Sequence, residues 1–320
     1  MKGKGATLDK LRVGLILFKQ RHYEKKWTCA LTPRLVEGIL ERLNCAWVES
    51  QQDYEQCIDE VDAFISMEPG WAAPILEFTR TRALRIKLAE KPAFIFMSDP
   101  HYGKWRQKYF LKNRFDYILA FYYFPTLFHF RKIPAERLIH FPWSLPDEWI
   151  FRGDITYSGE TRIACFGAGN HEAYSIRNWC RTFPFVEGTY NSGVENKVMT
   201  DEEYIDWLRN KDAVIAAGSD DPKYMLTTPK YFEIAASGAL LFAQYTEDLE
   251  RLGFQHMVNC VIFNRDNFVE LSEEYLGNPE SYLQIRKAGV DLIRQRHSLS
   301  QRLSFLEELI VETRNRKMKR

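Results

Sequence analysis

The feature that most constrains the fold of this chain is an alternation of short apolar segments with segments of helical periodicity, which begins at residue 12 and continues to the C-terminal region. Short continuous apolar segments are typical of strands in a parallel sheet that helices cover on both faces. In the first such unit, a strand over residues 12–19 precedes a helix over residues 32–44, with Thr32 as the N-cap and Pro33 in the first turn. We therefore predict an α/β fold.

The length of 320 residues favours two domains. Residues 151–160 are polar and contain glycine, which is typical of a linker, and a second alternating run follows them. We predict two Rossmann-like domains, over residues 1–152 and 153–320, that face each other across a cleft, with the last helix a candidate to pack back on the first domain. Strands are expected at 46–49, 63–67, 93–97, 117–121, 162–166, 213–217, 240–243 and 260–263, with a last short strand and a proline-flanked exit of the first domain within 138–146. Helices are expected at 79–90, 172–181, 202–210, 229–237, 247–252 and 268–276, followed by a helical stretch over 279–319 in which Ser298 or Ser300 caps the last helix.

The composition excludes several classes of protein. Hydrophobic residues make up 45% of the chain, and 44 basic residues nearly balance 43 acidic ones, which argues against disorder and against a surface that binds polyanions throughout. The six cysteines show no metal-binding spacing, so we expect free thiols and no zinc site. The N-terminal residues lack the pattern of a secretory signal, and no apolar stretch has the length of a membrane span. We expect a cytoplasmic protein.

The most informative segment is GSDDPKYMLTTPKYFEIAASGALLFA, residues 218–243. Thr228 and Pro229 are expected to start a helix directly after a strand and a polar loop, and the free N–H groups of a helix start attract anions. Lys230 and Glu233 lie three residues apart, so both side chains project from one face of the helix, which we expect to border a solvent-filled cleft. The alternative is an ordinary surface ion pair between the two side chains.

The segment TPKYFEIAASGALLFAQYTEDLERLGF, with the later FVELSEEYLGNPE and IRKAGVDLIRQRHSLSQRLSFLEELI, resembles the glycosyltransferases of the GT-B fold, group 1, and among them the spore maturation protein B-like (CgeB-like) proteins. The resemblance implies a hexosyl- or pentosyltransferase that uses a UDP- or GDP-sugar. It implies that Glu233 binds hydroxyl groups of the ribose or sugar and that Lys230 binds the diphosphate. Met225 stands where many retaining members carry a second glutamate.

A second candidate segment is FGAGNHEAYSIR, residues 166–177. Gly167 and Gly169 permit a close approach of the backbone to a phosphate, and Arg177 is placed to reach it. Related glycosyltransferases carry a Tyr-x-x-Arg sequence in this helix, which Tyr174 and Arg177 match. The alternative is a simple turn between a strand and a helix.

In the N-terminal half, Asp99 and His101 follow directly after an expected strand, where parallel sheets place functional loops. Either side chain is a candidate general base toward an acceptor hydroxyl. The alternative is a turn at Asp99-Pro100 with His101 as a helix cap. The loop Glu68-Pro69-Gly70-Trp71 is a further candidate for acceptor contacts.

The resemblance thus predicts a glycosyltransferase. We expect it to be independent of a metal ion, because no Asp-x-Asp cluster stands in a donor loop. The expected acceptor is a carbohydrate or a protein, with a modified nucleic-acid base as the alternative. A catalytically inactive nucleotide-sugar-binding protein of the same fold is the competing interpretation. The basic tail over residues 314–320 is expected to be a frayed, solvated helix end, with weak contact to a membrane surface or nucleic acid as its alternatives.

Overall fold

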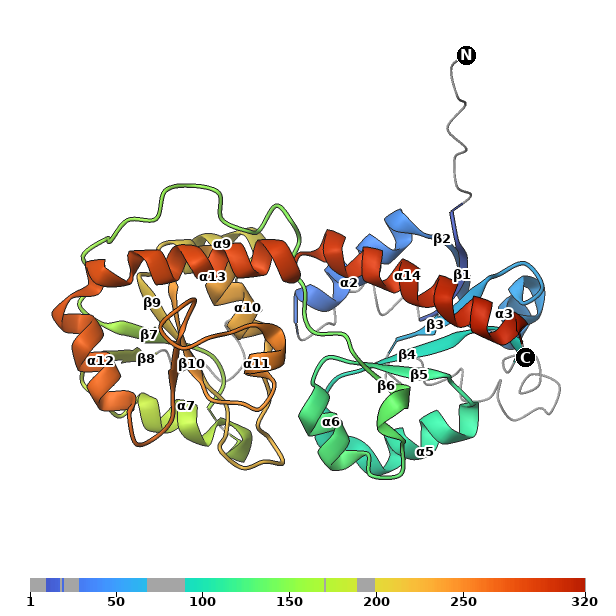
Figure 1. Cartoon of the computed structure of the whole chain (residues 1–320), viewed down its shortest axis with the longest axis horizontal. Helices are drawn as coiled ribbons and strands as arrows, with labels where there is room; N and C mark the ends of the chain where they lie inside the picture. The colour runs from blue at the N-terminus through green and yellow to red at the C-terminus, as the bar shows by residue number, and fades with distance from the viewer. Residues whose placement is uncertain are drawn as a thin grey trace, which may run out of the picture.

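A computed structural model describes residues 10–17, 19, 29–67, 90–169, 171–188 and 199–319. In these residues two parallel sheets lie side by side, one from each half of the chain (Figure 1). The sheet of the first domain has the strand order β2-β1-β3-β4-β5-β6, and the sheet of the second domain has the order β11-β10-β9-β7-β8. The predicted α/β fold with two Rossmann-like domains is confirmed.

The first domain keeps its central strands buried on both faces, as the continuous apolar segments predicted. Its strands are β1 (Arg12–Ile16), β2 (Asn44–Val48), β3 (Ala63–Ser66), β4 (Ala93–Met97), β5 (Tyr117–Ala120) and β6 (Leu138–His140). Its helices are α2 (Leu31–Arg42), α3 (Gln51–Cys57), η2 (Pro100–Tyr102), α5 (Gly103–Asn113), α6 (Tyr123–His129) and η3 (Ala135–Arg137). Nearly all of the helix predicted over 79–90, and the loop over 68–71, lie outside the described residues.

The expected cap of α2 is wrong. The helix begins at Leu31 with Ala30 as its N-cap, so Thr32 lies inside the first turn. The N–H groups of Leu31 and Thr32 instead hydrogen-bond the sulfur of Cys29. Pro33 is tolerated there because the N–H groups of a first helical turn have no partner within the helix.

The second domain contains most of the segments that the sequence predicted as site-forming. Its strands are β7 (Ile163–Cys165), β8 (Val186–Gly188), β9 (Ala213–Ala216), β10 (Leu240–Gln244) and β11 (Val261–Phe263). Its helices are η4 (Glu172–Tyr174), α7 (Ser175–Cys180), α9 (Asp201–Arg209), α10 (Pro229–Ser237), α11 (Leu249–Leu252), α12 (Phe268–Gly277), η5 (Pro279–Tyr282) and α13 (Leu283–Arg296). Helix α10 has the predicted bounds, with Thr228 as N-cap and Pro229 in the first turn.

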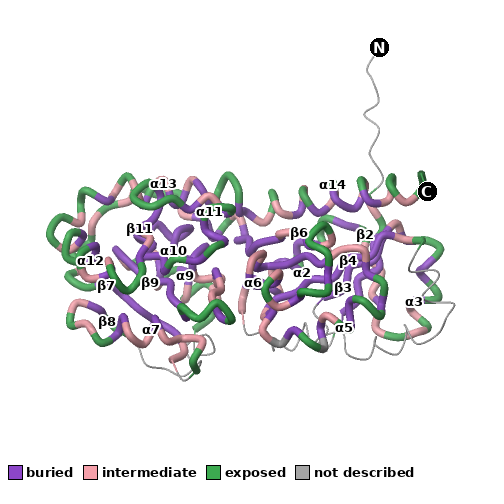
Figure 2. The backbone as a smooth tube through the Cα atoms, turned by 60° about the horizontal axis from the view of Figure 1, so that its bottom comes forward, coloured by how far each residue is buried: buried purple, intermediate pink, exposed green. Residues whose placement is uncertain are grey.

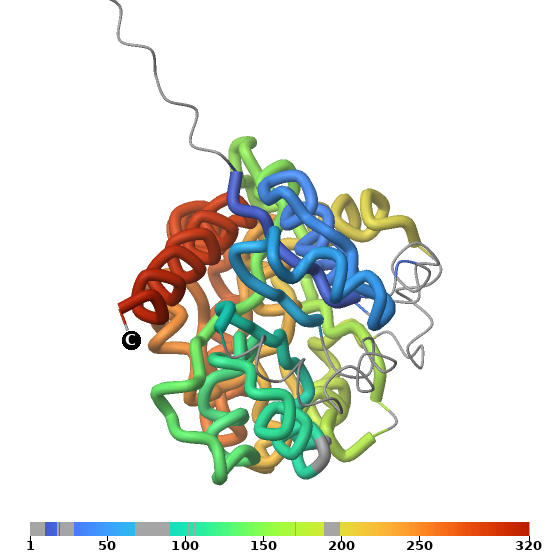
Figure 3. Tube along the Cα trace, turned by 90° about the vertical axis from the view of Figure 1, so that its right-hand side faces the viewer, coloured from blue at the N-terminus to red at the C-terminus, as the bar shows by residue number. Residues whose placement is uncertain are grey.

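The final helix, α14 (Leu299–Met318), leaves the second domain and packs along α2 of the first (Figures 1 and 3). The helical region breaks at His297, and the Ser298 hydroxyl accepts the N–H of Gln301 to cap the new helix. At this break the Leu145 N–H donates to the carbonyl oxygen of His297 at 3.0 Å, and the Leu299 N–H donates to that of Leu145 at 2.7 Å. The two passages of the chain between the domains are therefore bonded to each other.

The expectation of a frayed, solvated tail is wrong. The guanidinium of Arg314 lies 2.6 Å from the carboxylate of Asp62, and the ammonium of Lys317 lies 2.8 Å from that of Asp116. Both carboxylates belong to the first domain, so the basic residues of the last turns hold α14 against it.

The two domains also share hydrophobic packing. Buried residues colour the sheets of both lobes purple in Figure 2. One hydrophobic cluster contains Leu15 and Phe121 of the first domain, Leu241 of the second, and Leu306 of α14. The carboxyl ends of both sets of strands consequently lie against a contact between the domains, where the predicted site residues follow the strands.

Candidate functional site

Lys230 of α10 reaches across to the loop that follows β7. Its ammonium donates to the carbonyl oxygen of Phe166 at 2.8 Å and lies 3.5 Å from the centre of the Phe166 ring. Gly167 has a φ of 99°, and a Cβ atom at this position would overlap the Lys230 ammonium. The positive φ favours glycine at this position, and the absence of a side chain leaves room for the Lys230 ammonium.

Two arginines of the α7 segment converge on the same loop. Arg177 donates to the carbonyl oxygens of Ala217 at 3.0 Å and of Ala168 at 2.7 Å, and Arg181 donates to those of Cys165 at 3.3 Å and of Gly167. Both side chains are buried, and burial lowers the pKa of Arg177. Three cationic side chains thus surround one loop at the carboxyl end of a central strand, which makes that loop attractive to an anion.

The loop backbone and the start of α10 are tightly packed around these cations. A Cβ atom on Gly169 would overlap the Asn178 side-chain oxygen, whose amide nitrogen donates to the Gly169 carbonyl at 2.6 Å. Thr228 has the backbone conformation of an N-cap, but its side chain makes no capping hydrogen bond. In the described part of the chain, its buried hydroxyl oxygen has no hydrogen-bond partner.

Glu233 lies one turn further along α10 and is buried, with 5% of its surface exposed. Its Oε2 accepts a hydrogen bond from the Tyr204 hydroxyl of α9 at 2.7 Å. Burial raises the pKa of Glu233, while Tyr204 and the charge of Lys230 lower it. The expectation of a pair facing solvent is wrong for this side chain, because Glu233 is buried and α9 packs against the helix that carries it.

Asp99 and His101 lie at the carboxyl end of β4, on the first-domain side of the contact. Asp99 has a φ of 37° and makes no side-chain cap for η2, so its predicted alternative as a turn residue holds for the backbone. The His101 ring packs edge-on against Tyr224 of the second domain, with ring centres 5.4 Å apart. Burial lowers the pKa of His101, which favours the neutral imidazole.

The loop between β9 and α10 carries further contacts between the domains. Tyr224 also packs against His171, with ring centres 5.6 Å apart, and its hydroxyl donates to the Glu172 carboxylate at 2.5 Å. The His129 Nε2–H donates to the carbonyl oxygen of Lys223 at 3.0 Å. This loop therefore connects His101 and His129 of the first domain to the helix that carries Lys230 and Glu233.

A second contact between the domains involves Asp248. Its carboxylate accepts the backbone N–H groups of Tyr123 and Phe124, both at 3.0 Å, and so caps α6 of the other domain. The Arg251 guanidinium lies 3.9 Å from the centre of the Tyr123 ring. Burial raises the pKa of Asp248 to about 6.

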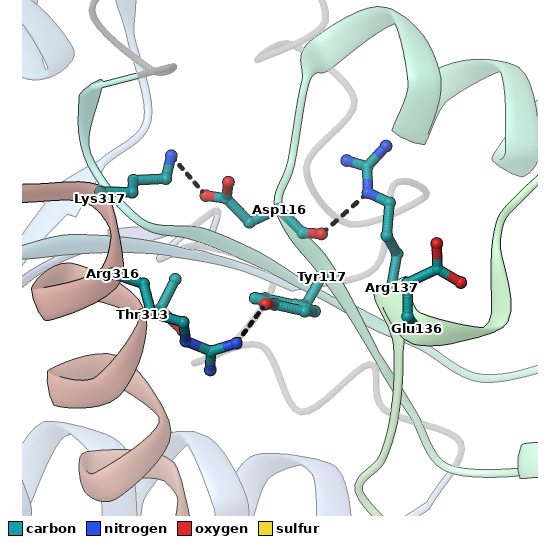
Figure 4. A pocket seen from close by; sticks show the side chains of 7 residues that line it. All are labelled: Asp116, Tyr117, Glu136, Arg137, Thr313, Arg316 and Lys317. Carbon is teal, nitrogen blue, oxygen red and sulfur yellow. Dashed lines mark hydrogen bonds and ion pairs between the residues drawn. The ribbon is translucent and has the colours of Figure 1, made fainter. Parts of the chain in front are cut away.

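A cavity of about 380 Å³ lies elsewhere, between α14 and the amino ends of β5 and β6 (Figure 4). Its charged side chains are engaged with the protein: Lys317 pairs with Asp116, and Arg316 donates to the Tyr117 hydroxyl at 3.1 Å. Ligands of open α/β sheets bind at the carboxyl ends of strands, so this cavity is on the wrong side of the sheet for the predicted chemistry.

Among the described residues, no group of three or more His, Cys, Asp or Glu side chains is arranged to hold a metal ion. In the same part of the chain, no helix has both the length and the hydrophobicity needed to cross a membrane.

Several residues of this arrangement were not predicted from the sequence. Arg181 follows Arg177 by four residues, so its place on the same helical face was available as a signal. Tyr204, Tyr224 and Asp248 had no such signal, because they reach their partners from other elements through tertiary packing. The predicted residues Lys230, Gly167 and Arg177 lie together, whereas Asp99 and His101 lie on the opposing domain.

Comparison with solved structures identifies the fold. The structure superposes on a glycosyltransferase from Rickettsia africae ESF-5 with a TM-score of 0.57 at 10% identity, covering 95% of this chain and 98% of that one. It superposes equally well, with a TM-score of 0.57 at 8% identity, on Anabaena HepE in complex with UDP and glucose, covering 95% and 100% of the two chains. HepE in complex with UDP-glucose gives a TM-score of 0.55 at 10% identity, covering 95% and 99%.

Comparison at the sequence level locates the family resemblance in the second domain. No curated protein matches the chain. Residues 153–308 match the family model described as glycosyl transferase-like. This region contains the loop after β7, the α7 arginines and all of α10. The chain thus has the GT-B fold of two Rossmann-like domains and carries a glycosyl transferase-like region over residues 153–308.

Proposed function

We propose that the protein transfers a sugar from a nucleotide-diphosphate sugar to an acceptor hydroxyl. The observation that carries this proposal is the convergence of Lys230, Arg177 and Arg181 on the Gly167–Gly169 loop, one helical turn from the Glu233 carboxylate. A cationic loop beside a buried carboxylate matches a ligand that has a diphosphate at one end and hydroxyl groups at the other. The family match over the same residues supports this assignment.

In the proposed reaction the bond between the sugar carbon and the diphosphate oxygen breaks as the acceptor oxygen forms a bond to that carbon. Negative charge develops on the leaving diphosphate, where the three cations and the N–H groups at the start of α10 stabilise it. The reacting sugar has oxocarbenium character, as in glycoside chemistry generally. Gly169 keeps the loop close to the phosphates, and Thr228 offers a hydroxyl to them.

On the acceptor side we assign Asp99 and His101 as candidate general bases. The neutral imidazole that burial favours at His101 is the form that accepts a proton from a hydroxyl. Because three cationic side chains are already in place, we propose that catalysis needs no divalent metal. We also propose a cytoplasmic location for the protein.

The proposal extends to the donor and the acceptor. The Anabaena structures contain UDP or UDP-glucose, which supports a UDP-sugar ahead of a GDP-sugar. A glycan or a protein is the proposed acceptor, a modified nucleic-acid base remains the alternative, and membership of the CgeB-like group remains a prediction. The proposed division into domains at residues 152 and 153 lies within the connection between β6 and β7.

A second candidate, a catalytically inactive nucleotide-sugar-binding protein, is favoured by one observation. Met225 occupies the position at which the resemblance places a second glutamate, so a catalytic group of many retaining relatives is missing. Release of free UDP from UDP-glucose by the purified protein, above a protein-free blank, supports a transferase. Binding with no release over long incubation supports the inactive candidate.

The donor assignment is tested with a pair of lysine variants. Lys230→Met should weaken UDP by about 2 kcal/mol and leave uridine affinity unchanged, because only UDP carries the charge that the ammonium contacts. Lys211→Met is the matched control, since Lys211 pairs with Glu160 at the amino end of β9. Calorimetry with UDP and uridine makes the comparison. Equal losses for UDP and uridine, or equal losses in the two variants, would contradict the assignment.

A further inference from the structure

The Glu233 carboxylate is hydrogen-bonded to a side chain that has no part in the donor contacts proposed above. The Tyr204 hydroxyl donates to Oε2 of Glu233 at 2.7 Å from the neighbouring helix α9. The two helices pack together, and the Tyr204 ring lies edge-on to Phe166, with ring centres 5.8 Å apart. Tyr204 therefore touches both the carboxylate of α10 and the aromatic ring over which Lys230 lies.

This contact fixes one oxygen of the carboxylate. A glutamate side chain has several rotatable bonds, so an unrestrained carboxylate would lose conformational entropy when it binds donor hydroxyls. With Oε2 held by Tyr204, the carboxylate already has one orientation before the donor arrives. A carboxylate has further lone pairs on Oε1 and Oε2 that can accept hydrogen bonds from hydroxyl groups.

The same contact favours the ionised carboxylate. Burial alone disfavours the charge, and the nearby Asp201 carboxylate disfavours it further. The Tyr204 hydroxyl and the ammonium of Lys230 act in the opposite direction and lower the pKa of Glu233. The ionised form carries no donor hydrogen and accepts hydrogen bonds at both oxygens, so this contact favours the form of Glu233 that best accepts hydroxyl groups.

We infer that Tyr204 is a positioning residue for donor binding, which orients the Glu233 carboxylate toward the hydroxyl groups of the donor. This inference rests on the proposed function and deepens it, because it names the residue that prepares the donor carboxylate.

The test compares Tyr204→Phe with Tyr231→Phe. Both changes remove one hydrogen-bonded hydroxyl from the second domain, and the Tyr231 hydroxyl donates instead to the Gln244 carbonyl at 3.0 Å. Tyr204→Phe should weaken UDP-glucose about tenfold at pH 7 and more strongly at lower pH, as lost hydrogen bonds to charged groups do. Tyr231→Phe should leave the donor affinity and its pH dependence unchanged.

A second measurement separates this inference from the proposed function. Carbon NMR of the Glu233 carboxyl in the empty protein should show a higher pKa in Tyr204→Phe than in the wild type, whether or not a donor binds. An unchanged Glu233 pKa, or equal donor affinities in wild type and Tyr204→Phe, overturns the inference and leaves the proposed function intact if the wild type binds UDP-glucose. Failure of the wild type to bind any nucleotide sugar overturns both.

Discussion

At the scale of single residues, the proposed function depends on buried charged side chains. Arg177 is 3% exposed and Glu233 is 5% exposed. Buried charges are costly to the fold, and residues that bear them are retained where binding needs them. A functional role for Glu233 therefore has a measurable consequence for stability.

We expect Glu233→Gln to lose donor affinity without losing stability. Burial raises the pKa of Glu233 in the folded state above its value in the unfolded state. The ionised side chain therefore destabilises the fold at pH values above the folded-state pKa, whereas the uncharged glutamine side chain does not. Glutamine keeps an oxygen that accepts the Tyr204 hydroxyl, so the packing is preserved. The melting temperature of the empty protein at pH 7 should stay the same or rise, while UDP-glucose binding weakens by about 2 kcal/mol.

Thermal unfolding and calorimetry on the same sample test this prediction. A large loss of stability with normal donor affinity would make Glu233 a structural residue.

At the scale of elements, the sequence predicted most of the strands and the bounds of α10, because continuous apolar segments and a Thr-Pro helix start are local signals. It predicted no helix at α6, and it misplaced the start of α2. The cation cluster was predicted in part, since Lys230, Gly167 and Arg177 carry motif signals. The contacts of Tyr204 and Asp248 could not be predicted from the sequence, because their partners are distant in sequence and lie on other elements.

The cap that Asp248 provides for α6 should titrate near neutral pH. Burial raises the pKa of Asp248 in the folded state to about 6, above its value in the unfolded state. The ionised carboxylate therefore destabilises the fold above pH 6, and this loss disappears as the pH falls through 6 and the carboxylate becomes protonated. A shift of about two pKa units corresponds to about 3 kcal/mol. Asp248→Asn keeps an acceptor oxygen for the N–H groups of Tyr123 and Phe124 and removes the charge.

Urea unfolding of the wild type and Asp248→Asn between pH 4 and pH 7 measures this contribution as a difference, because the contributions of other groups cancel. The asparagine variant should gain stability relative to the wild type as the pH rises. A difference that stays constant across this range would contradict the shifted titration.

At the scale of the whole molecule, α14 connects the second domain to the first. Arg314 and Lys317 pair with carboxylates of the first domain in partly exposed positions. Such pairs are each worth up to about 1 kcal/mol and are screened by salt. Deleting residues 314–320 should therefore lower the free energy of unfolding by about 1–2 kcal/mol, and the loss should shrink in high salt.

Deletion of residues 318–320 alone is the matched control, because it retains both ion pairs. Urea titrations at low and high salt compare the two truncations. If the longer deletion cost no more than the shorter one, the tail would be the solvated end that its sequence suggested.

The bonded break at Leu145 and His297 has a mechanical consequence. Two separate segments of the chain connect the domains, and backbone hydrogen bonds between Leu145 and residues 297 and 299 join these segments at one place. A movement of one domain relative to the other would therefore bend both connections at the same place. The His101–Tyr224 and Asp248–Tyr123 contacts are made by other segments of the two domains, and an opening of the domains would separate them. If a donor enters between the domains, as proposed, then its entry and the release of the diphosphate product would both use this opening movement.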